Sequence, residues 1–165
     1  MSIRSIIILF VASFCAGCSL QSESTLDPSR TISGKIVRVS EGDLLHLRHH
    51  GQVTPIRLHG IDCPERGQAY SEQARYRAEC LAKDEEVSVV VITHDLSGKT
   101  IGEVLLQNGI SVNQELVASG HCWWYRQYAP SSSKLASLEE TARAKHWGVW
   151  AQPNPIPPWV YRSSR

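Results

Sequence analysis

The sequence predicts an α+β domain that is predominantly β, and two observations support this fold class. Apolar runs of strand length, separated by turn residues, occupy most of residues 31–105. Their order is three strands, a helix and two strands, with helices after them, which is the order expected of an α+β fold. With 165 residues the chain has room for one domain with a hydrophobic core, and we find no internal repeat and no second domain in the sequence.

Three strands are expected first. An apolar-rich run over 31–39 is broken by the polar turn 40–42. The leucine-rich run 44–47 follows and ends at residues 49–52, whose composition is typical of a hairpin turn. A third run over 56–61 is stopped by a proline. These runs predict three consecutive strands, the second and third of them joined as a hairpin.

A helix and two further strands are expected next. Residues 70–82 contain no proline or glycine, and their apolar residues recur at helical spacing. Valine and isoleucine residues at 87–92 predict the fourth strand. The polar loop 94–98 then leads to the fifth strand at 101–105.

The C-terminal third is predicted to be mostly helical. Asn113 is the expected N-cap of a short helix that is ended by Gly120. Residues 122–128 are rich in aromatic side chains and are expected to be extended, and residues 134–146 fit a second long helix. Four of the eight prolines lie in 153–159, so we expect this segment to be an extended tail on the surface.

Five strands and about three helices are compatible with a small five-stranded barrel of the OB type. The pattern alone does not favour this barrel over other small barrels. The expected elements therefore define the fold class and leave the architecture open.

The first residues have the features of an export signal. Arg4 provides a positive start, and the apolar run 6–14 is shorter than the roughly 20 residues that a transmembrane helix needs. The run ends in Cys-Ala-Gly-Cys at 15–18, which resembles a bacterial lipobox with Cys18 as the lipidated first residue. The first cysteine of this tetrapeptide stands where the motif usually has leucine, so a plain signal peptide cut nearby and an uncleaved anchor remain alternatives.

We therefore expect an exported chain that is lipid-anchored to the bacterial cell envelope through Cys18 and faces the periplasm or the exterior. The polar segment after the lipobox has too few apolar residues to fold. The expected divisions of the chain are a lipoprotein signal peptide at 1–17, a polar tether at 18–30, one domain at 31–160 and a C-terminal tail at 161–165.

Net charge limits the function classes. Removing residues 1–17 from a chain of 17 basic and 16 acidic residues removes one cation, Arg4, and leaves 16 of each. A neutral domain gains little long-range attraction to nucleic acid, so any phosphate must be bound by a few placed cations. This balance argues against a high-affinity nucleic-acid-binding protein and is compatible with an enzyme.

Three cysteines, Cys63, Cys80 and Cys122, lie in the body of the chain. An oxidising compartment permits disulfides, but three cysteines cannot all pair within one chain, and the sequence leaves the pairing open. One hypothesis is an envelope stability protein with a disulfide between Cys80 and Cys122.

The densest motif for chemistry is Arg-Leu-His-Gly-Ile-Asp-Cys-Pro-Glu at 57–65. Its proline fixes a tight loop that holds the carboxylates of Asp62 and Glu65, and the turn Glu41-Gly42-Asp43 offers two more. Hard cations such as calcium take several carboxylate and carbonyl oxygens at roughly 2.3–2.6 Å, and two acidic turns can supply them. On spacing alone, however, such acidic turns are more often simply solvated.

Several stretches, taken in order, resemble the motifs of the staphylococcal nuclease family, and together they span roughly residues 31–160. Two further stretches, 123–126 and 157–159, resemble bacterial members of that family. The resemblance implies an OB-fold barrel with three helices and calcium-dependent hydrolysis of DNA or RNA. The motifs lie at 34–39, 41–43, 56–65, 112–117 and 148–151.

The resemblance also implies a role for each matching residue. Asp43 and Asp62 match the family's calcium carboxylates, and Cys63 stands where a backbone carbonyl completes the site. Glu65 matches the general base that takes a proton from water, and Arg57 matches one of two arginines that hold the scissile phosphate. Without the resemblance, a surface arginine, a turn former and a helix-entry charge would be the simpler interpretations of residues 57, 62 and 65.

This chain departs from the family pattern at three positions. Lys99 replaces the second arginine, and lysine keeps the charge but loses the two-pronged fork, so transition-state stabilisation should weaken. Ser97 replaces a tyrosine of the same motif, and Leu44 replaces the threonine after Asp43. We therefore expect a nuclease, more in keeping with an endonuclease than an exonuclease, whose activity is reduced by Lys99.

The aromatic stretch after Cys122 offers candidates for substrate contact. Arg126 and Tyr128 are the expected substrate-binding residues, whereas two of the three aromatic residues at 123–125 are equally well explained as packing. We expect a monomer with DNA or RNA as substrate. The alternative is a catalytically weakened or inactive OB module that binds nucleic acid or protein at the cell envelope.

Overall fold

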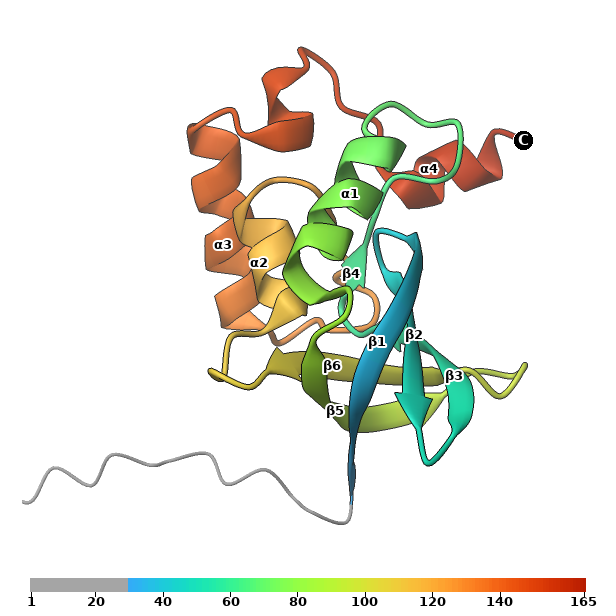
Figure 1. The fold of residues 1–165 in the computed structure, drawn as a ribbon. Coiled ribbons are helices and arrows are strands. Elements are labelled where there is room, and N and C mark those ends of the chain that lie inside the picture. The colour runs from blue at the N-terminus through green and yellow to red at the C-terminus, as the bar shows by residue number, and fades with distance from the viewer. Residues whose placement is uncertain (1–29) are drawn as a thin grey trace, which may run out of the picture.

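The computed structural model describes residues 30–165 (Figure 1). The expected signal peptide, the lipidation site Cys18 and all but the last residue of the tether 18–30 lie outside the described residues. Among the described helices, none is long and apolar enough to span a bilayer.

Five strands close into a barrel, as the sequence predicts for an OB-type fold. Going round the barrel their order is β1-β2-β3-β6-β5, and all neighbours are antiparallel except β3 and β6, which are parallel. A barrel interior of this size is filled by side chains, and Ile36, Leu45, Ile56 and Val104 are fully buried there. The strands are β1 (Thr31–Glu41), β2 (Leu44–His49), β3 (Gln52–Leu58), β5 (Glu86–His94) and β6 (Thr100–Leu106).

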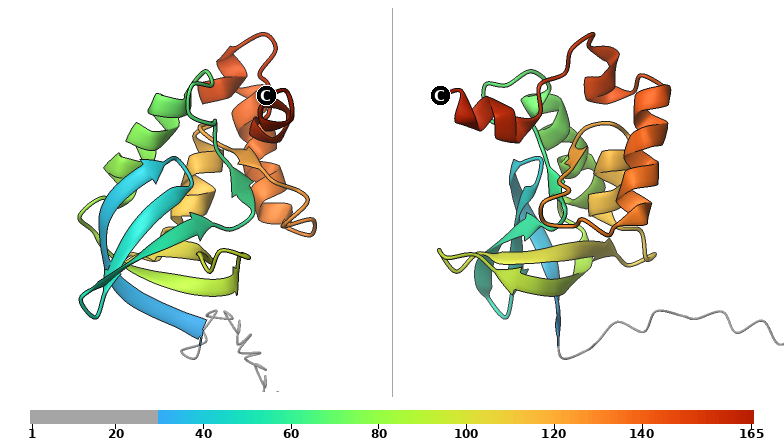
Figure 2. Two further views of the ribbon diagram at one scale, coloured as in Figure 1. Left: turned by 90° about the vertical axis from the view of Figure 1, so that its right-hand side faces the viewer. Right: turned by 180° about the vertical axis from the view of Figure 1, so that it is seen from behind.

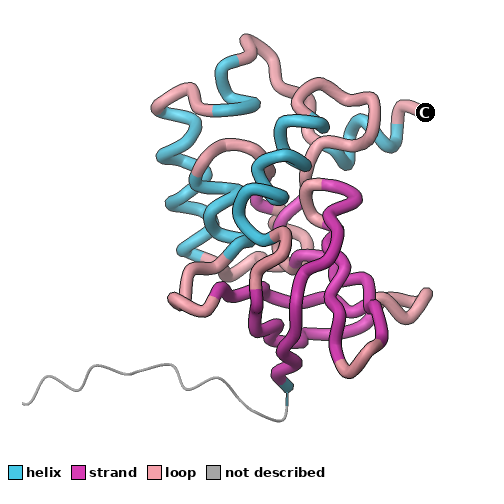
Figure 3. The backbone as a smooth tube through the Cα atoms, in the orientation of Figure 1, coloured by secondary structure: helices cyan, strands magenta, loops and turns pink. Residues whose placement is uncertain are grey.

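Four α-helices lie in the described chain, one more than predicted, and they gather on one side of the barrel (Figures 2 and 3). The additional helix, α4, contradicts the extended tail predicted for 153–159 at its last two residues, whereas residues 153–157 are neither helix nor strand. A proline suits the first turn of a helix because its missing N–H needs no partner there, so α4 begins at Pro158 within the proline-rich segment. The helices are α1 (Ser71–Ala82), α2 (Val112–Ala118), α3 (Ser133–Ala144) and α4 (Pro158–Ser163).

The start of α2 differs from the prediction. Ser111, not Asn113, is the N-cap, and its hydroxyl accepts a backbone N–H of the first turn. Asn113 is buried and bonds to the barrel instead: its Oδ1 accepts the N–H of Val104 at 3.1 Å and its Nδ2 donates to the carbonyl of His59 at 3.0 Å. The Asn113 side chain therefore makes tertiary hydrogen bonds in place of the capping bond that the sequence predicted.

The third predicted strand is divided into two. Gly60, at a φ of 75°, turns the chain away from the barrel after β3, and a Cβ there would lie 2.9 Å from that of Ala129. The following strand β4 (Ile61–Asp62) pairs with β7 (Trp123–Trp124) rather than with the barrel. The expected extended segment 122–128 is a strand only in β7, because the chain turns back at Tyr125.

A disulfide joins Cys63 and Cys122, so the hypothesis of a Cys80–Cys122 bridge is wrong. The register explains the pairing: Asp62 lies opposite Trp123 in the antiparallel pair β4–β7, which places the next residue on one strand opposite the preceding residue on the other. Both bonded cysteines are buried, and Cys80 is a free, exposed thiol.

Candidate active site

The two acidic turns predicted from the sequence lie against each other. Figure 1 shows the β1–β2 turn beside β4. At the centre of this turn, a Cβ on Gly42 would lie 2.9 Å from the Cβ of Cys63 and 3.0 Å from that of Ala74. Because only a glycine permits this approach, Gly42 brings the Asp43 turn onto the loop that begins at Asp62.

Arg57 projects from β3 into the first half of the site. Its Nη1 donates to Asp43 Oδ2 at 3.0 Å, and its Nη2 donates to Glu41 Oε2 at 3.4 Å. Strand pairing fixes this geometry, since Arg57 lies opposite Leu44, the residue after Asp43. The Arg57 side chain is half-buried and the Asp43 side chain is almost fully buried.

Asp62 and Glu65 form the second half of the site with an arginine that the sequence analysis missed. Arg162, on α4, donates from Nη2 to Asp62 Oδ2 at 2.8 Å and from Nη1 to Asp62 Oδ1 at 3.0 Å. The same Nη1 donates to Glu65 Oε1. Arg162 falls in the segment expected to be a tail, 100 residues from Asp62 in sequence, so no local pattern connects the two.

The two halves form one electrostatic unit. Burial raises the pKa of Asp43 to about 6; Arg57 opposes this shift, and the charges of Asp62 and Glu41 add to it. Burial also raises the pKa of Asp62, against the hydrogen bond and charge of Arg162. These shifts have the physical cause expected of carboxylates that lack sufficient counter-charge in a poorly hydrated site.

A charge balance shows what the site lacks. Burial acts to lower the pKa of Arg57, but four carboxylates outweigh it and raise the pKa above its ordinary value. Those carboxylates, with Arg57 and Arg162, leave a formal surplus of two negative charges, which one divalent cation would balance. The four carboxylates belong to Glu41, Asp43, Asp62 and Glu65.

The donor set of the site suits a hard cation, although it is not a ready-made cage. Carboxylate oxygens are the ligands that calcium and magnesium prefer. Within residues 30–165, however, no three His, Cys, Asp or Glu side chains cluster as they would around a metal ion. Side chains could therefore supply only part of a coordination sphere, and backbone carbonyls or water would have to complete it.

Lys99 has a carboxylate partner in its own loop. Its Nζ lies 3.9 Å from Asp95 Oδ2 in the β5–β6 loop. Asp95 organises that loop through its Oδ1, which accepts the backbone N–H groups of Ser97 and Lys99. In the described part of the chain, no hydrogen bond or ion pair joins Lys99 to the carboxylates of the cluster, although the next residue, Thr100, pairs with Ile56 beside Arg57.

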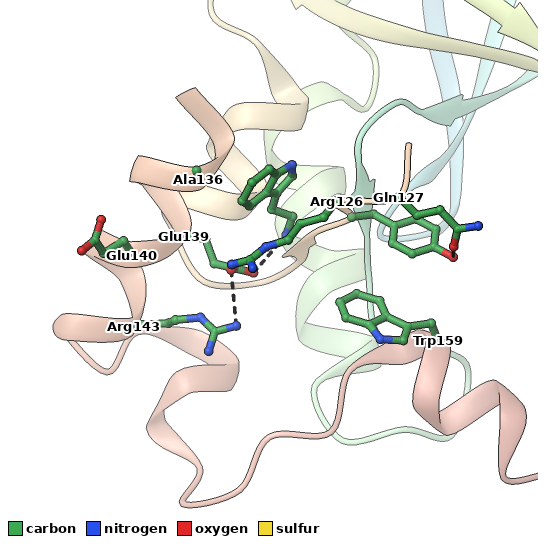
Figure 4. A pocket seen from close by; sticks show the side chains of 9 residues that line it. Arg126, Gln127, Ala136, Glu139, Glu140, Arg143 and Trp159 are labelled. Carbon is green, nitrogen blue, oxygen red and sulfur yellow. Dashed lines mark hydrogen bonds and ion pairs between the residues drawn. The ribbon is translucent and has the colours of Figure 1, made fainter. Parts of the chain in front are cut away.

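Arg126 lines a pocket of about 750 Å³ that contains no residue of the acidic cluster, and Tyr128 lies beside Tyr125, another residue of this lining (Figure 4). The Arg126 guanidinium lies over the ring of Trp124, 4.7 Å from its centroid, and lines this pocket. Tyr128 is exposed and meets the ring of Tyr125 edge-on at 4.9 Å. Trp159 also lines the pocket and stacks on Tyr125, so α4 contributes one residue to the pocket and another to the acidic site.

In the aromatic stretch, Trp123 packs in the interior of the fold and is not a surface residue. It is buried and meets Trp150 edge-on at a centroid distance of 5.2 Å. Trp124 and Tyr125 are only partly buried. The structure therefore brings together Arg57, Asp43, Asp62 and Glu65, with Cys63 next to Asp62, whereas Arg126 lines the aromatic pocket and Lys99 pairs with Asp95.

Several known proteins similar to this chain are nucleases by name. The family model described as staphylococcal nuclease homologue matches residues 55–152. A protein named as an uncharacterized endonuclease from Escherichia coli O157:H7 is 34% identical over 131 residues, which cover 79% of this chain and 85% of that protein. A micrococcal nuclease from Shigella flexneri is 34% identical over 138 residues, covering 78% of this chain and 79% of the relative.

A plant protein extends the likeness beyond bacteria. The staphylococcal-like nuclease CAN1 of Arabidopsis thaliana is 34% identical over 110 residues, which cover 67% of this chain but only 33% of that protein. The matched family region contains Arg57, Asp62 and Glu65, whereas Asp43 and Arg162 lie on either side of it.

Proposed function

This chain belongs to the staphylococcal nuclease-like family, a family of nucleases, and from that premise we propose that it is a calcium-dependent endonuclease acting on DNA or RNA. The observation that carries the proposal is the cluster of Arg57, Asp43, Asp62 and Glu65 with its surplus of two negative charges. We further propose that the protein acts as a monomer.

Asp43 and Asp62 are the residues that would hold the calcium ion, with the backbone carbonyl of Cys63. Both carboxylates are buried, and the raised pKa of Asp43 supports a site in which a positive charge is missing. Among the described residues, no hydrogen bond is donated to the Cys63 carbonyl. A calcium ion bound there would neutralise charge that develops on the phosphate and would lower the pKa of a water molecule.

Glu65 is the proposed general base. Its Oε1 accepts a hydrogen bond from Arg162, which leaves Oε2 without a protein partner in the described chain. In the reaction, Oε2 takes a proton from water while the water oxygen bonds to phosphorus, and the bond between phosphorus and the leaving sugar oxygen breaks. The leaving oxygen then gains a proton from solvent, so atoms and charges balance.

Arg57 is the proposed phosphate-binding residue. A guanidinium can donate two parallel hydrogen bonds to phosphate oxygens, and that of Arg57 remains partly exposed beside the carboxylates. Its present partners, Asp43 and Glu41, hold it in place before substrate arrives. Preorganised donors of this kind stabilise a transition state without further reorganisation.

We propose that Lys99 reduces the activity, and this residue also favours the second candidate function. Its ammonium pairs with Asp95 and lacks the two-pronged fork of an arginine, so it would stabilise a phosphate less well. A catalytically inactive module that binds nucleic acid or protein would show the same feature. Arg126 and Tyr128, near the aromatic pocket, are the proposed contacts for a strand beyond the scissile bond.

The test is hydrolysis of single-stranded DNA by the purified full chain. We expect turnover with calcium, no turnover with a chelator, and a large loss of rate in Glu65→Gln, because this change removes the base but keeps its size. Binding of DNA without turnover at any calcium concentration would favour the inactive module. Full activity in Glu65→Gln would rule out the role assigned to Glu65.

We also propose that the chain is exported and lipid-anchored through Cys18. The support is the lipobox-like sequence before Cys18, which lies outside the described residues. Cells fed a labelled fatty acid should label the wild-type protein and not Cys18→Ser, and only the wild type should sediment with membranes. Equal labelling of both would contradict the anchor.

A further inference from the structure

Two hydrogen-bonded connections join the C-terminal segment to Glu65, the first of them through Gln68. Gln68 is a buried side chain in the loop after Glu65. Its Oε1 accepts the backbone N–H of Glu65 at 2.9 Å, and its Nε2 donates to the carbonyl of Ile156 at 2.6 Å. The backbone of Glu65 is thus tied to the segment that leads into α4.

The second connection is Arg162. Its two terminal nitrogens make three hydrogen bonds, two to Asp62 and one to Glu65. In the described chain, Arg162 is the only hydrogen-bond partner of the Glu65 carboxylate. A planar fork of donors can hold two carboxylates in a fixed relation, whereas an ammonium can donate to both but rotates freely and fixes their relation less well.

The guanidinium has a defined position because α4 is anchored elsewhere. Pro158 is buried, and the Trp159 ring stacks on Tyr125 with centroids 5.2 Å apart and planes inclined by 11°. Trp159 and Arg162 are three residues apart, so both lie on one side of the helix. The stacked ring at one end therefore aims the arginine at the acidic loop.

We propose that Arg162 is a positioning residue of the hydrolytic site, which acts through Glu65 and Asp62 and not on the substrate itself. This inference rests on the proposed function. Arg162 donates to Oε1 of Glu65 and so leaves Oε2 as the oxygen that accepts the proton. It also bonds both oxygens of Asp62, and the guanidinium thereby sets the distance between the carboxylates of Glu65 and Asp62. Partners behind a metal ligand typically affect activity by about 10–100-fold when they are lost.

The kinetic test compares three variants of the full chain on single-stranded DNA with saturating calcium. Arg162→Gln should lower kcat by about 10–100-fold and change KM by less than about threefold. Arg162→Lys, which keeps the charge without the fork, should recover part of the loss. Arg165→Gln is the matched control, because this arginine lies on the same chain end but bonds the hydroxyl of Tyr161.

A double-mutant cycle tests whether Arg162 acts through the base. If it does, adding Arg162→Gln to Glu65→Gln should lower kcat by less than about threefold more, since groups that act as one unit are not additive. A full additional loss would contradict the proposal. So would a raised KM with unchanged kcat, which indicates substrate contact, or a faster rate at low calcium, which indicates competition with the cation.

A second measurement does not depend on turnover. Amide hydrogen exchange of peptides covering 63–68 should be faster in Arg162→Gln than in wild type or Arg165→Gln, in the absence of calcium. Unchanged exchange would overturn the proposed anchoring whatever the rates. An active wild type with an equally active Arg162→Gln would refute the inference alone, whereas an inactive wild type would refute the proposed function and the inference with it.

Discussion

The acidic site contains two guanidinium–carboxylate pairs that are chemically alike and structurally different. Arg57 and Asp43 are 14 residues apart and are joined by the pairing of neighbouring strands. Arg162 and Asp62 are 100 residues apart and depend on a strand outside the barrel and on a six-residue helix near the chain end. The barrel pair is thus held by strand pairing and the C-terminal pair by elements outside the barrel, although in both pairs the carboxylate is almost fully buried and the guanidinium is partly exposed.

The difference predicts different roles for the two guanidinium–carboxylate pairs. A group held by strand pairing is preorganised and suits transition-state stabilisation. A group held by a docked chain end can be lost without unfolding the barrel, because the ends of domains are the least stable parts of most folds. The barrel pair should therefore matter more for the chemical step and the C-terminal pair more for the geometry of the loop.

The largest expected effect is that of Arg57. Arg57→Gln should lower kcat/KM by roughly 10²–10³-fold, because it removes a placed donor to the phosphate. The loss should exceed that of Arg162→Gln, measured with the same DNA substrate and calcium concentration. An equal or smaller loss would show that the two pairs do not differ as their scaffolds suggest.

The disulfide offers a way to weaken the loop that carries Asp62 and Glu65, because Cys63 lies between these two residues. Replacing Cys63 and Cys122 together by serine should lower the free energy of unfolding by about 2–4 kcal/mol, measured by denaturant titration. Amide exchange should rise more around 61–68 than around 44–58. Cys80→Ser serves as the control and should change neither quantity, since this cysteine is exposed and unpaired.

A third test uses the pKa of Asp43, raised from 3.8 to about 6 by burial. Between these two values the folded state binds more protons at Asp43 than the unfolded state does, so its contribution to stability falls as pH rises from about 4 to 6. In chelator, wild type should lose up to about 3 kcal/mol relative to Asp43→Asn over this window. Saturating calcium should reduce the difference, and a difference that is flat with pH would contradict the shift.

The smallest expected effect is at position 99. Because the Lys99 ammonium lies against Asp95, which would hold a guanidinium in the same loop, Lys99→Arg should raise kcat/KM by less than about threefold. Lys99→Gln should be similarly mild, and both are measured in the DNA hydrolysis assay. A gain of more than tenfold in Lys99→Arg would mean that a third guanidinium can join the site and that its activity is held down at this position.

The same contrast explains what could be predicted from the sequence. The barrel strands follow from their runs of apolar residues, so local pattern was sufficient to predict them. Arg57, Asp62 and Glu65 stand in one nine-residue motif, but it was the resemblance to a known family that favoured a site there over solvated charges. The resemblance to a known family then supplied the barrel type and the partner turn at Asp43. The length of α1 was also predictable, because apolar residues at helical spacing fill it without a break.

What the sequence did not predict depends on contacts between distant segments. Asn113 has a side chain that suits a helix cap, but it bonds the N–H of Val104 and the carbonyl of His59 instead. The pairing of Cys63 follows from the register of two-residue strands too short to show any periodicity. Arg162 stands on a helix shorter than two turns, after prolines that suggest an extended chain, and only the folded structure places it on Asp62.

The first strand has a consequence for where the enzyme would work. β1 enters the barrel at Thr31 and ends at Glu41, so its eleven residues separate the N-terminal entry point from the acidic cluster. At about 3.3 Å per residue this strand spans at most about 33 Å. If the protein is anchored to a membrane through its N-terminal end, as proposed, β1 separates the acidic cluster from the membrane by up to its own length. Nucleic acid in solution could then reach the cluster.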